Sequence, residues 1–152
     1  LGGEPGIGKS TLLLQTAQGI VSKYGKDSKV LYISGEESAA QIKERAERLK
    51  INCDNIQLLC TSRLEDSLDA MDSINPILVI VDSIQTIYSV SAGLIPGTIN
   101  QLKYCANEFI SWVKERDTSH QESVLDSRAS LTHLCMTSKT HRHTSSLVIV
   151  ST

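Results

Sequence analysis

A glycine-rich octapeptide near the start of the chain constrains the fold more than any other feature of the sequence. It satisfies the pattern G-x-x-x-x-G-K-[ST] in full and leads directly into a segment with helical apolar spacing. Its residues are Gly3, Glu4, Pro5, Gly6, Ile7, Gly8, Lys9 and Ser10, and Thr11 follows. Gly6 and Gly8 permit backbone angles that aim successive N–H groups at one anion. The pattern therefore predicts a phosphate-binding turn, or P-loop, at the start of a helix.

The side chains of this turn predict one particular ligand, ATP with Mg²⁺. We expect Lys9 to reach the β- and γ-phosphate oxygens, and the Ser10 hydroxyl to complete the shell of the Mg²⁺ ion. The helix that begins near Lys9 adds the positive end of its dipole. The candidate nucleotide-binding residues are Gly3, Glu4, Pro5, Gly6, Ile7, Gly8, Lys9, Ser10 and Thr11. Lys9 is also a candidate catalytic residue, and Ser10 a candidate metal ligand.

Residues 1–117 alternate between helical and strand-like segments. Apolar residues recur at helical spacing over about 9–23, after Ser38, after Ser62 and over 99–113. The motifs Ser38-x-x-Gln41 and Ser62-x-x-Glu65 each match a capping box, which marks a helix start. Strand-like runs lie between them at 29–34, 56–60 and 77–81. This alternation predicts an α/β fold with a mostly parallel sheet and helices on both faces, in which 77–81 is a central strand.

Acidic residues stand where two of these strands end. Asp82 follows the apolar run 77–81, as the Walker B aspartate does, and we expect it to hold the metal beside the P-loop. Glu36 and Glu37 follow the strand 29–34 through Gly35. Paired carboxylates at that position can orient a water for attack on a γ-phosphate, and either can instead favour the dipole of the next helix. Ligands of parallel sheets bind at the carboxyl ends of the strands, which favours a metal-binding role for Asp82. For the two glutamates both interpretations stay open at this point.

Composition limits the remaining choices. The 15 Lys and Arg nearly balance the 17 Asp and Glu, so a whole-surface grip on a polyanion is excluded while a local DNA-binding loop is not. No apolar run is long enough to span a membrane. The four cysteines form no C-x-x-C pair, and we interpret them as buried thiols in a reducing compartment. The chain lacks an initiator methionine and a charged leader, so we expect a fragment without a signal peptide.

From Thr118 the sequence changes character. Residues 118–152 hold all four histidines and no Gly or Pro, and only 147–150 has a strand-like pattern. An α/β domain normally uses Gly or Pro at its turns. The cluster at 141–143 has two histidines without a Cys or carboxylate at ligand spacing, which favours a solvated polar segment over a metal site. We therefore predict two parts, an α/β core over 1–117 and a Ser-, Thr- and His-rich tail over 118–152.

Three segments in combination resemble the RadA/Sms family of DNA repair proteins. They are GGEPGIGKSTLLLQ at 2–15, LYISGEES at 31–38 and VIVDSIQT at 79–86. The resemblance covers residues 1 to about 117. It implies that 1–117 is a RecA-like P-loop ATPase core, truncated here at both ends and lacking most of its first strand, and that the tail over 118–152 is divergent. In such a core Glu36 is the catalytic acid. It further implies a DNA-dependent ATPase of the branch-migration type that acts in repair and recombination as a homo-oligomeric ring on single-stranded or branched DNA. Such a protein is cytoplasmic in bacteria and organellar in a eukaryote. After residue 117 the family pattern stops, which suggests that the tail is not native family sequence.

Two other functions stay open at this point. One is a P-loop kinase that transfers the γ-phosphoryl group to a small molecule, and the pair Glu36-Glu37 favours water over such an acceptor. The other is a fragment that binds nucleotide without turning it over. Phosphate release without an acceptor, phosphate transfer only with one, and binding without turnover would distinguish the three.

Overall fold

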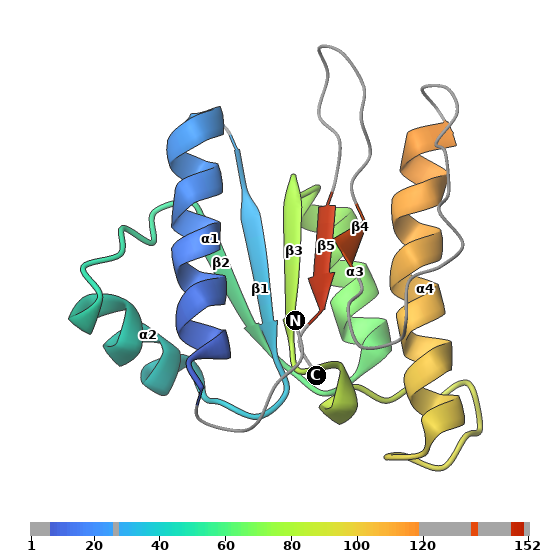
Figure 1. The fold of residues 1–152 in the computed structure, drawn as a ribbon. Coiled ribbons are helices and arrows are strands. Elements are labelled where there is room, and N and C mark those ends of the chain that lie inside the picture. Colours follow the sequence, from blue (N-terminus) through green and yellow to red (C-terminus); the bar gives the residue numbers. More distant parts are fainter. Residues whose placement is uncertain (1–6, 26–27, 119–134, 137–146, 151–152) are drawn as a thin grey trace.

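The computed structural model describes residues 7–25, 28–118, 135–136 and 147–150, which form helices and strands in alternation (Figure 1). The helices are α1 (Lys9–Tyr24), α2 (Ala39–Arg48), α3 (Leu64–Ile74) and α4 (Ile99–Thr118), with a short 3₁₀ helix η1 (Ile84–Thr86). The strands are β1 (Val30–Ser34), β2 (Ile56–Cys60), β3 (Leu78–Asp82), β4 (Cys135–Met136) and β5 (Leu147–Val150). The predicted helices and strands of the first 117 residues are all present in this part of the chain.

The strands form one mixed sheet in the order β2-β1-β3-β5-β4. β1 pairs in parallel with β2 and β3, and β3 pairs in parallel with β5, so the predicted parallel sheet with a central β3 is confirmed. The register places Tyr32 opposite Ile80 and Ser34 opposite Asp82. The strand predicted at 147–150 is present as β5. Its antiparallel neighbour β4 was not predicted, since two residues carry no periodic signal.

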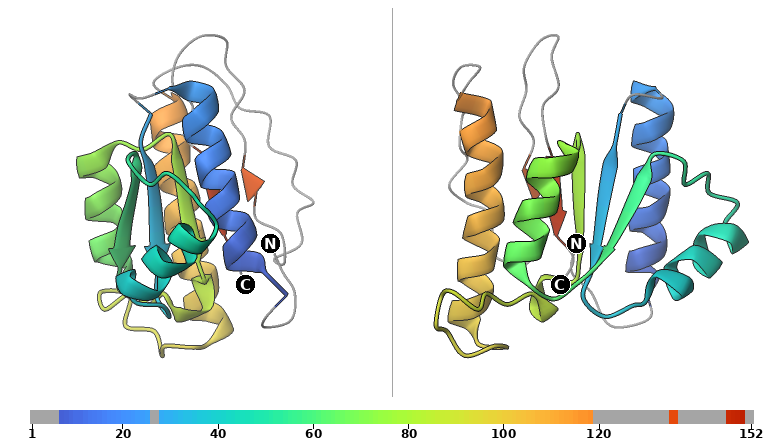
Figure 2. Two further views of the ribbon diagram at one scale, coloured as in Figure 1. Left: turned by 90° about the vertical axis from the view of Figure 1, so that its left-hand side faces the viewer. Right: turned by 180° about the vertical axis from the view of Figure 1, so that it is seen from behind.

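A pair of helices covers each face of the sheet (Figures 1 and 2). An apolar core lies beneath each pair. On one face, Val30, Tyr32, Leu78 and Ile80 pack with buried residues of α1 and α2. On the other face, the alternate residues Leu31, Ile33, Val79 and Val81 pack with residues of α3 and α4. Since side chains alternate across a strand, β1 and β3 are apolar throughout because both of their faces are covered. Helices on both faces are therefore confirmed.

One predicted helix start is confirmed and one is wrong. Ser38 caps α2, with its side chain accepting from the Gln41 N–H and the Gln41 side chain accepting from the Ser38 N–H. α3 instead begins at Leu64 after Arg63, which makes no side-chain cap. The Ser62-x-x-Glu65 box does not form because the Glu65 carboxylate accepts hydrogen bonds from Ser89, Val90 and Ser91 in a loop distant in sequence.

The interpretation of the cysteines as buried is correct for only one of the three whose side chains are described. Cys105 is buried, whereas Cys53 and Cys60 are exposed, and none of these three forms a disulfide. Cys60 is exposed because it lies on β2, which stands at the edge of the sheet. The side chain of Cys135 and the histidine cluster at 141–143 lie outside what the structure describes. Within the described ranges, no helix combines the length and the apolar character needed to cross a membrane.

Candidate functional site

The carboxyl ends of the parallel strands and the first turn of α1 lie at the same end of the molecule (Figure 1). Asp82 is the last residue of β3, and Glu36 and Glu37 follow β1 directly. The register brings these positions level, since Ser34 at the end of β1 lies opposite Asp82. The fold therefore gathers the predicted acidic residues at the carboxyl ends of the strands, where ligands of parallel α/β folds bind.

The start of α1 has the geometry of an anion-binding helix end. Gly8 is its N-cap residue and has a left-handed backbone conformation, with φ of 94°. A Cβ on Gly8 would meet nothing within 4 Å, so the positive φ and not crowding accounts for glycine there. No side chain caps the helix, and the N–H groups of a first helical turn have no partner within the helix. Ile7 is exposed and Lys9, Ser10 and Thr11 are half-buried. Gly3, Glu4, Pro5 and Gly6 lie outside the described residues.

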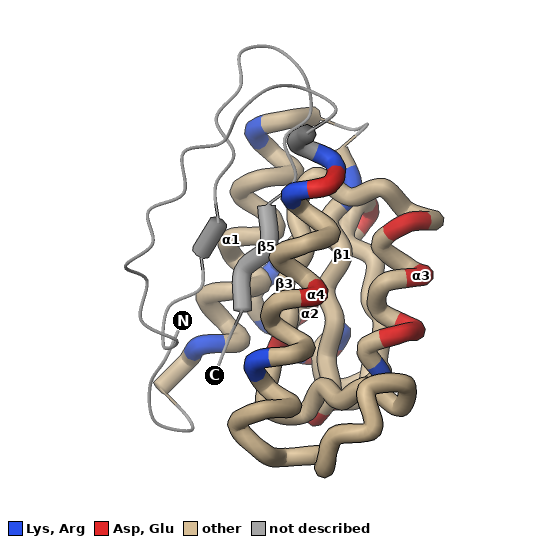
Figure 3. The backbone as a smooth tube through the Cα atoms, turned by 90° about the vertical axis from the view of Figure 1, so that its right-hand side faces the viewer, with Lys and Arg blue, Asp and Glu red and all other residues tan. Residues whose placement is uncertain are grey.

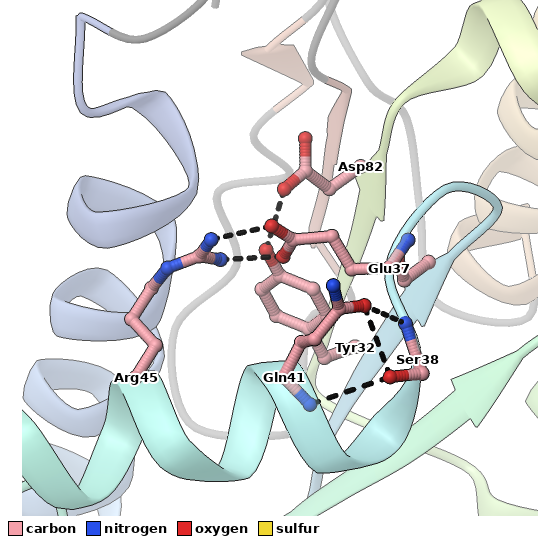
Figure 4. Close-up of polar contacts among 7 residues, drawn as sticks. Tyr32, Glu37, Ser38, Gln41, Arg45 and Asp82 are labelled. Carbon is pink, nitrogen blue, oxygen red and sulfur yellow. Dashed lines mark hydrogen bonds and ion pairs between the residues drawn. The ribbon is translucent and has the colours of Figure 1, made fainter.

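Asp82 is fixed by a tyrosine that the sequence analysis did not single out. The Tyr32 hydroxyl donates to Asp82 Oδ2 at 2.7 Å, and the Tyr32 side chain is fully buried (Figure 4). Burial, and then the negative charge of Asp82, raise the pKa of the Tyr32 hydroxyl far above its ordinary value. The hydroxyl therefore stays protonated and donates to the carboxylate at every physiological pH. The peptide bond between Asp82 and Ser83 is cis.

The two neighbouring glutamates have different partners. Glu37 accepts from both terminal nitrogens of Arg45 on α2, in a forked ion pair (Figure 4). The Glu37 N–H donates to Ser34 Oγ at 3.0 Å. The hydrogen bond to Glu37 raises the pKa of the Arg45 guanidinium above its ordinary value. Glu36 is exposed and accepts one hydrogen bond, from Ser83 Oγ to its Oε1 at 3.0 Å. Glu37 is thus held in a structural pair, while Glu36 stands in solvent beside the end of β3.

Gly35 allows the end of β1 to approach the turn after β3. A Cβ on Gly35 would lie 2.0 Å from Thr86 Oγ1 and 2.8 Å from Thr86 Cβ. Thr86 Oγ1 donates to the Ser83 carbonyl at 2.8 Å, and the Gly35 N–H donates to the Asp82 carbonyl at 3.3 Å. This close packing places Glu36 beside Ser83. The only signal for it in the sequence is a glycine between a strand and an acidic pair.

The side-chain oxygen atoms at this end of the sheet suit a magnesium ion that is also bound by phosphate. Ser10 offers a hydroxyl and Asp82 a carboxylate, and Mg²⁺ prefers oxygen ligands. Among the described residues, no three His, Cys, Asp or Glu side chains gather as a metal cage. Mg²⁺ commonly uses one or two protein ligands together with waters and substrate phosphates, so the set present fits a metal that arrives with a nucleotide.

The parallel sheet, its covering helices and the polar residues at the carboxyl ends of its strands define an α/β core fragment of the RecA-like class. The chain is 61% identical over 118 residues to the DNA repair protein RadA of Treponema pallidum, which covers 78% of this chain and 25% of that protein. It is 45% identical over 119 residues to DNA repair protein RadA of Rickettsia prowazekii, covering 77% and 26%. For DNA repair protein RadA of Bacillus subtilis it is 43% over 116 residues, covering 76% and 25%.

The chain therefore carries a segment that belongs to the RadA family of DNA repair proteins, as the sequence resemblance predicted. It spans about a quarter of the length of these curated relatives. No family model matches the chain.

Proposed function

We propose that this chain carries the ATP-binding and ATP-hydrolysing core of a DNA repair protein. The observation that supports the proposal most directly is that three groups lie at the same end of the sheet, where the parallel strands end. These are the uncapped start of α1 with Lys9 and Ser10, Asp82 at the end of β3, and Glu36 after β1. In a P-loop enzyme, these groups hold the phosphates, the metal and the attacking water respectively.

In this proposal the glycine-rich turn and the first turn of α1 bind the triphosphate. Backbone N–H groups donate to phosphate oxygens, and the Lys9 ammonium reaches the β- and γ-phosphates. Ser10 and Asp82 are the protein ligands of Mg²⁺, which when bound neutralises charge on the phosphates. The ordered Asp82 carboxylate suits this role because Tyr32 already fixes one of its two oxygens.

Glu36 would orient the water that attacks the γ-phosphorus. The exposure of its carboxylate leaves room for that water, and the hydrogen bond from Ser83 Oγ fixes Oε1. The water oxygen bonds to phosphorus as the bond from phosphorus to the β–γ bridging oxygen breaks, and ADP leaves with that electron pair. Glu36 acts as the general base: it takes up one proton from the water as the new bond forms and passes that proton to the released phosphate. Glu37 is less suited because Arg45 occupies both of its oxygens.

The DNA partner and the assembly rest on the relatives and not on this chain alone. Since the relatives are DNA repair proteins, we propose single-stranded or branched DNA as the partner, with a homo-oligomeric ring and a bacterial cytoplasmic location. Acidic residues line α3, at Glu65, Asp66, Asp69 and Asp72 (Figure 3). That helix would repel a phosphate backbone, so DNA contact is expected elsewhere on the molecule.

The test uses the full-length protein that contains this segment. We expect phosphate release from ATP with Mg²⁺ and no added acceptor, at a rate that single-stranded DNA increases. Lys9→Ala should abolish or severely weaken ATP binding, because it removes the side-chain cation of the phosphate cradle. A folded Lys9→Ala variant with wild-type affinity would refute the P-loop assignment. Phosphate transfer only with an acceptor would indicate a kinase, and nucleotide binding without release would indicate an inactive binding module.

A further inference from the structure

The Tyr32 side chain is fully buried, and its hydroxyl forms a hydrogen bond at the carboxyl end of β3. Tyr32 lies in the middle of β1, opposite Ile80, and its side chain packs in the apolar core beneath α1 and α2. A phenylalanine would fill that core equally well. Asp82 lies two residues beyond Ile80 on β3, and residues two apart on a strand share a face. The Tyr32 ring therefore lies along the core while its hydroxyl reaches Asp82 Oδ2, at 2.7 Å (Figure 4).

Because the group that donates to Asp82 is a neutral hydroxyl, it does not neutralise the negative charge of the carboxylate. A buried or half-buried carboxylate is commonly fixed by Arg or Lys, which would neutralise it. Arg45 lies in the same cluster, but both of its terminal nitrogens donate to Glu37. In the part of the chain that the structure describes, Asp82 forms no ion pair within 4 Å. A neutral hydroxyl orients the carboxylate and leaves its negative charge available to a cation.

We propose that Tyr32 is a positioning residue for metal binding, which holds Asp82 Oδ2 so that Oδ1 faces the metal of a metal–nucleotide complex. The proposal rests on the proposed function, since it takes Asp82 as a ligand of that metal. Hydrogen bonds to a ligating carboxylate fix its orientation, and their removal typically costs about 10–100-fold in metal affinity or activity. The Arg45–Glu37 pair supports the same arrangement by keeping the guanidinium away from Asp82.

The test is Tyr32→Phe in the full-length protein, which removes one oxygen and keeps the ring. The binding of a fluorescent, non-hydrolysable ATP analogue is followed while Mg²⁺ or Mn²⁺ is titrated. We expect the metal concentration for half-maximal binding to rise roughly tenfold, with unchanged affinity for the analogue in the absence of metal. Tyr104→Phe is the matched control, because Tyr104 packs against the core on the opposite face of the sheet. Its metal titration should equal that of the wild type.

Asp82→Asn completes a double-mutant cycle. If Tyr32 acts through the Asp82 carboxylate, Tyr32→Phe should have no further effect on the metal titration in the Asp82→Asn background. An equal additional shift in that background would overturn the proposal, as would a wild-type titration for Tyr32→Phe alone. Should Tyr32→Phe not fold, the wild type gives a second measurement. Addition of metal with the analogue should then change the tyrosine absorption band, and Asp82→Asn should remove the change; no change would overturn the proposal. A wild type that binds no metal–nucleotide would instead refute the proposed function itself.

Discussion

At the scale of single residues, the glutamates that follow β1 differ in their surroundings although they are adjacent in sequence. Glu36 is exposed and touches Ser83, whereas Glu37 is half-buried and paired with Arg45. Because a group that activates water must be reachable by water, exposure favours Glu36. Because the forked ion pair ties Arg45, in the last turn of α2, to the segment that follows β1, Glu37 is expected to act on stability.

Glutamine substitutions separate these two roles. In the full-length protein, Glu36→Gln should keep ATP binding and lower single-turnover hydrolysis by about 10²–10⁴-fold, as expected for a lost general base. Glu37→Gln should hydrolyse ATP much faster than Glu36→Gln and lose about 1–2 kcal/mol of unfolding free energy, because it weakens charged hydrogen bonds to Arg45. If Glu37→Gln is the slower enzyme, the two roles are reversed. Wild-type rates for both variants would place the activating group elsewhere.

Gly35 gives a prediction on packing. Gly35→Ala should lower the free energy of unfolding by about 1–3 kcal/mol, because the new methyl group would overlap Thr86 and force the backbone apart. Chemical denaturation measures the effect. Gly19→Ala is the matched control, since Gly19 lies in α1 with open space around it, and there alanine should stabilise by about 0.5–1 kcal/mol. Equal stability of Gly35→Ala and the wild type would contradict the close approach to Thr86.

At the scale of elements, Glu65 joins the start of α3 to the loop after η1. Its Oε1 accepts from the Ser89 and Ser91 hydroxyls and from the Val90 and Ser91 N–H groups. Burial alone would raise the pKa of Glu65, but these hydrogen bonds outweigh it and lower the pKa from 4.5 to about 2. The ionised carboxylate therefore holds this loop against the start of α3, together with the backbone hydrogen bonds of Tyr88 to Ser62 and Leu64.

The lowered pKa predicts a particular loss of stability in acid. A carboxyl whose folded-state pKa is depressed contributes stability above its unfolded pKa of 4.5, and this contribution is lost as pH falls towards about 2. Glu65→Gln should cost about 1 kcal/mol at pH 7 and flatten the decline of unfolding free energy over that range. Glu44→Gln, at an exposed position of α2, should leave the decline unchanged. Parallel declines for Glu65→Gln and the wild type would contradict this account.

The elements were predictable to the extent that their signals are local. Helical spacing, the apolar run of β3 and the cap at Ser38 lie within a few residues, and each is confirmed. The Ser62 box was wrong because Glu65 finds partners more than 20 residues away in sequence. Tyr32 was missed for the same reason, since its bond to Asp82 depends on the register of two strands. The roles of Lys9, Ser10, Glu36 and Asp82 stay predictions, although the fold brings their elements to the same end of the sheet.

At the scale of the whole molecule, the sheet joins the two parts into which the sequence divides. Strand β5 comes from residues 118–152, whose composition differs from that of the core, and it pairs with β3 over four positions. This leaves β3 with a parallel neighbour on each side. Because a central strand needs partners for its backbone groups on both edges, pairing with β5 would satisfy N–H and C=O groups of β3 that are otherwise unpaired. The predicted boundary at 117 stays a prediction of composition.

Amide hydrogen exchange in the full-length protein tests this pairing directly. If β5 is part of the sheet, N–H groups of Leu147–Val150 that donate to β3 should exchange as slowly as those of β1, because they open only with the core. The matched comparison is β2, an edge strand whose outward N–H groups have no strand partner in the described sheet and should exchange faster. Removal of residues 119–152 should then speed exchange in β3 along the edge that faces β5. Rapid exchange throughout 147–150, together with unchanged protection of β3 after that deletion, would contradict the pairing and leave β1 as the only strand neighbour of β3.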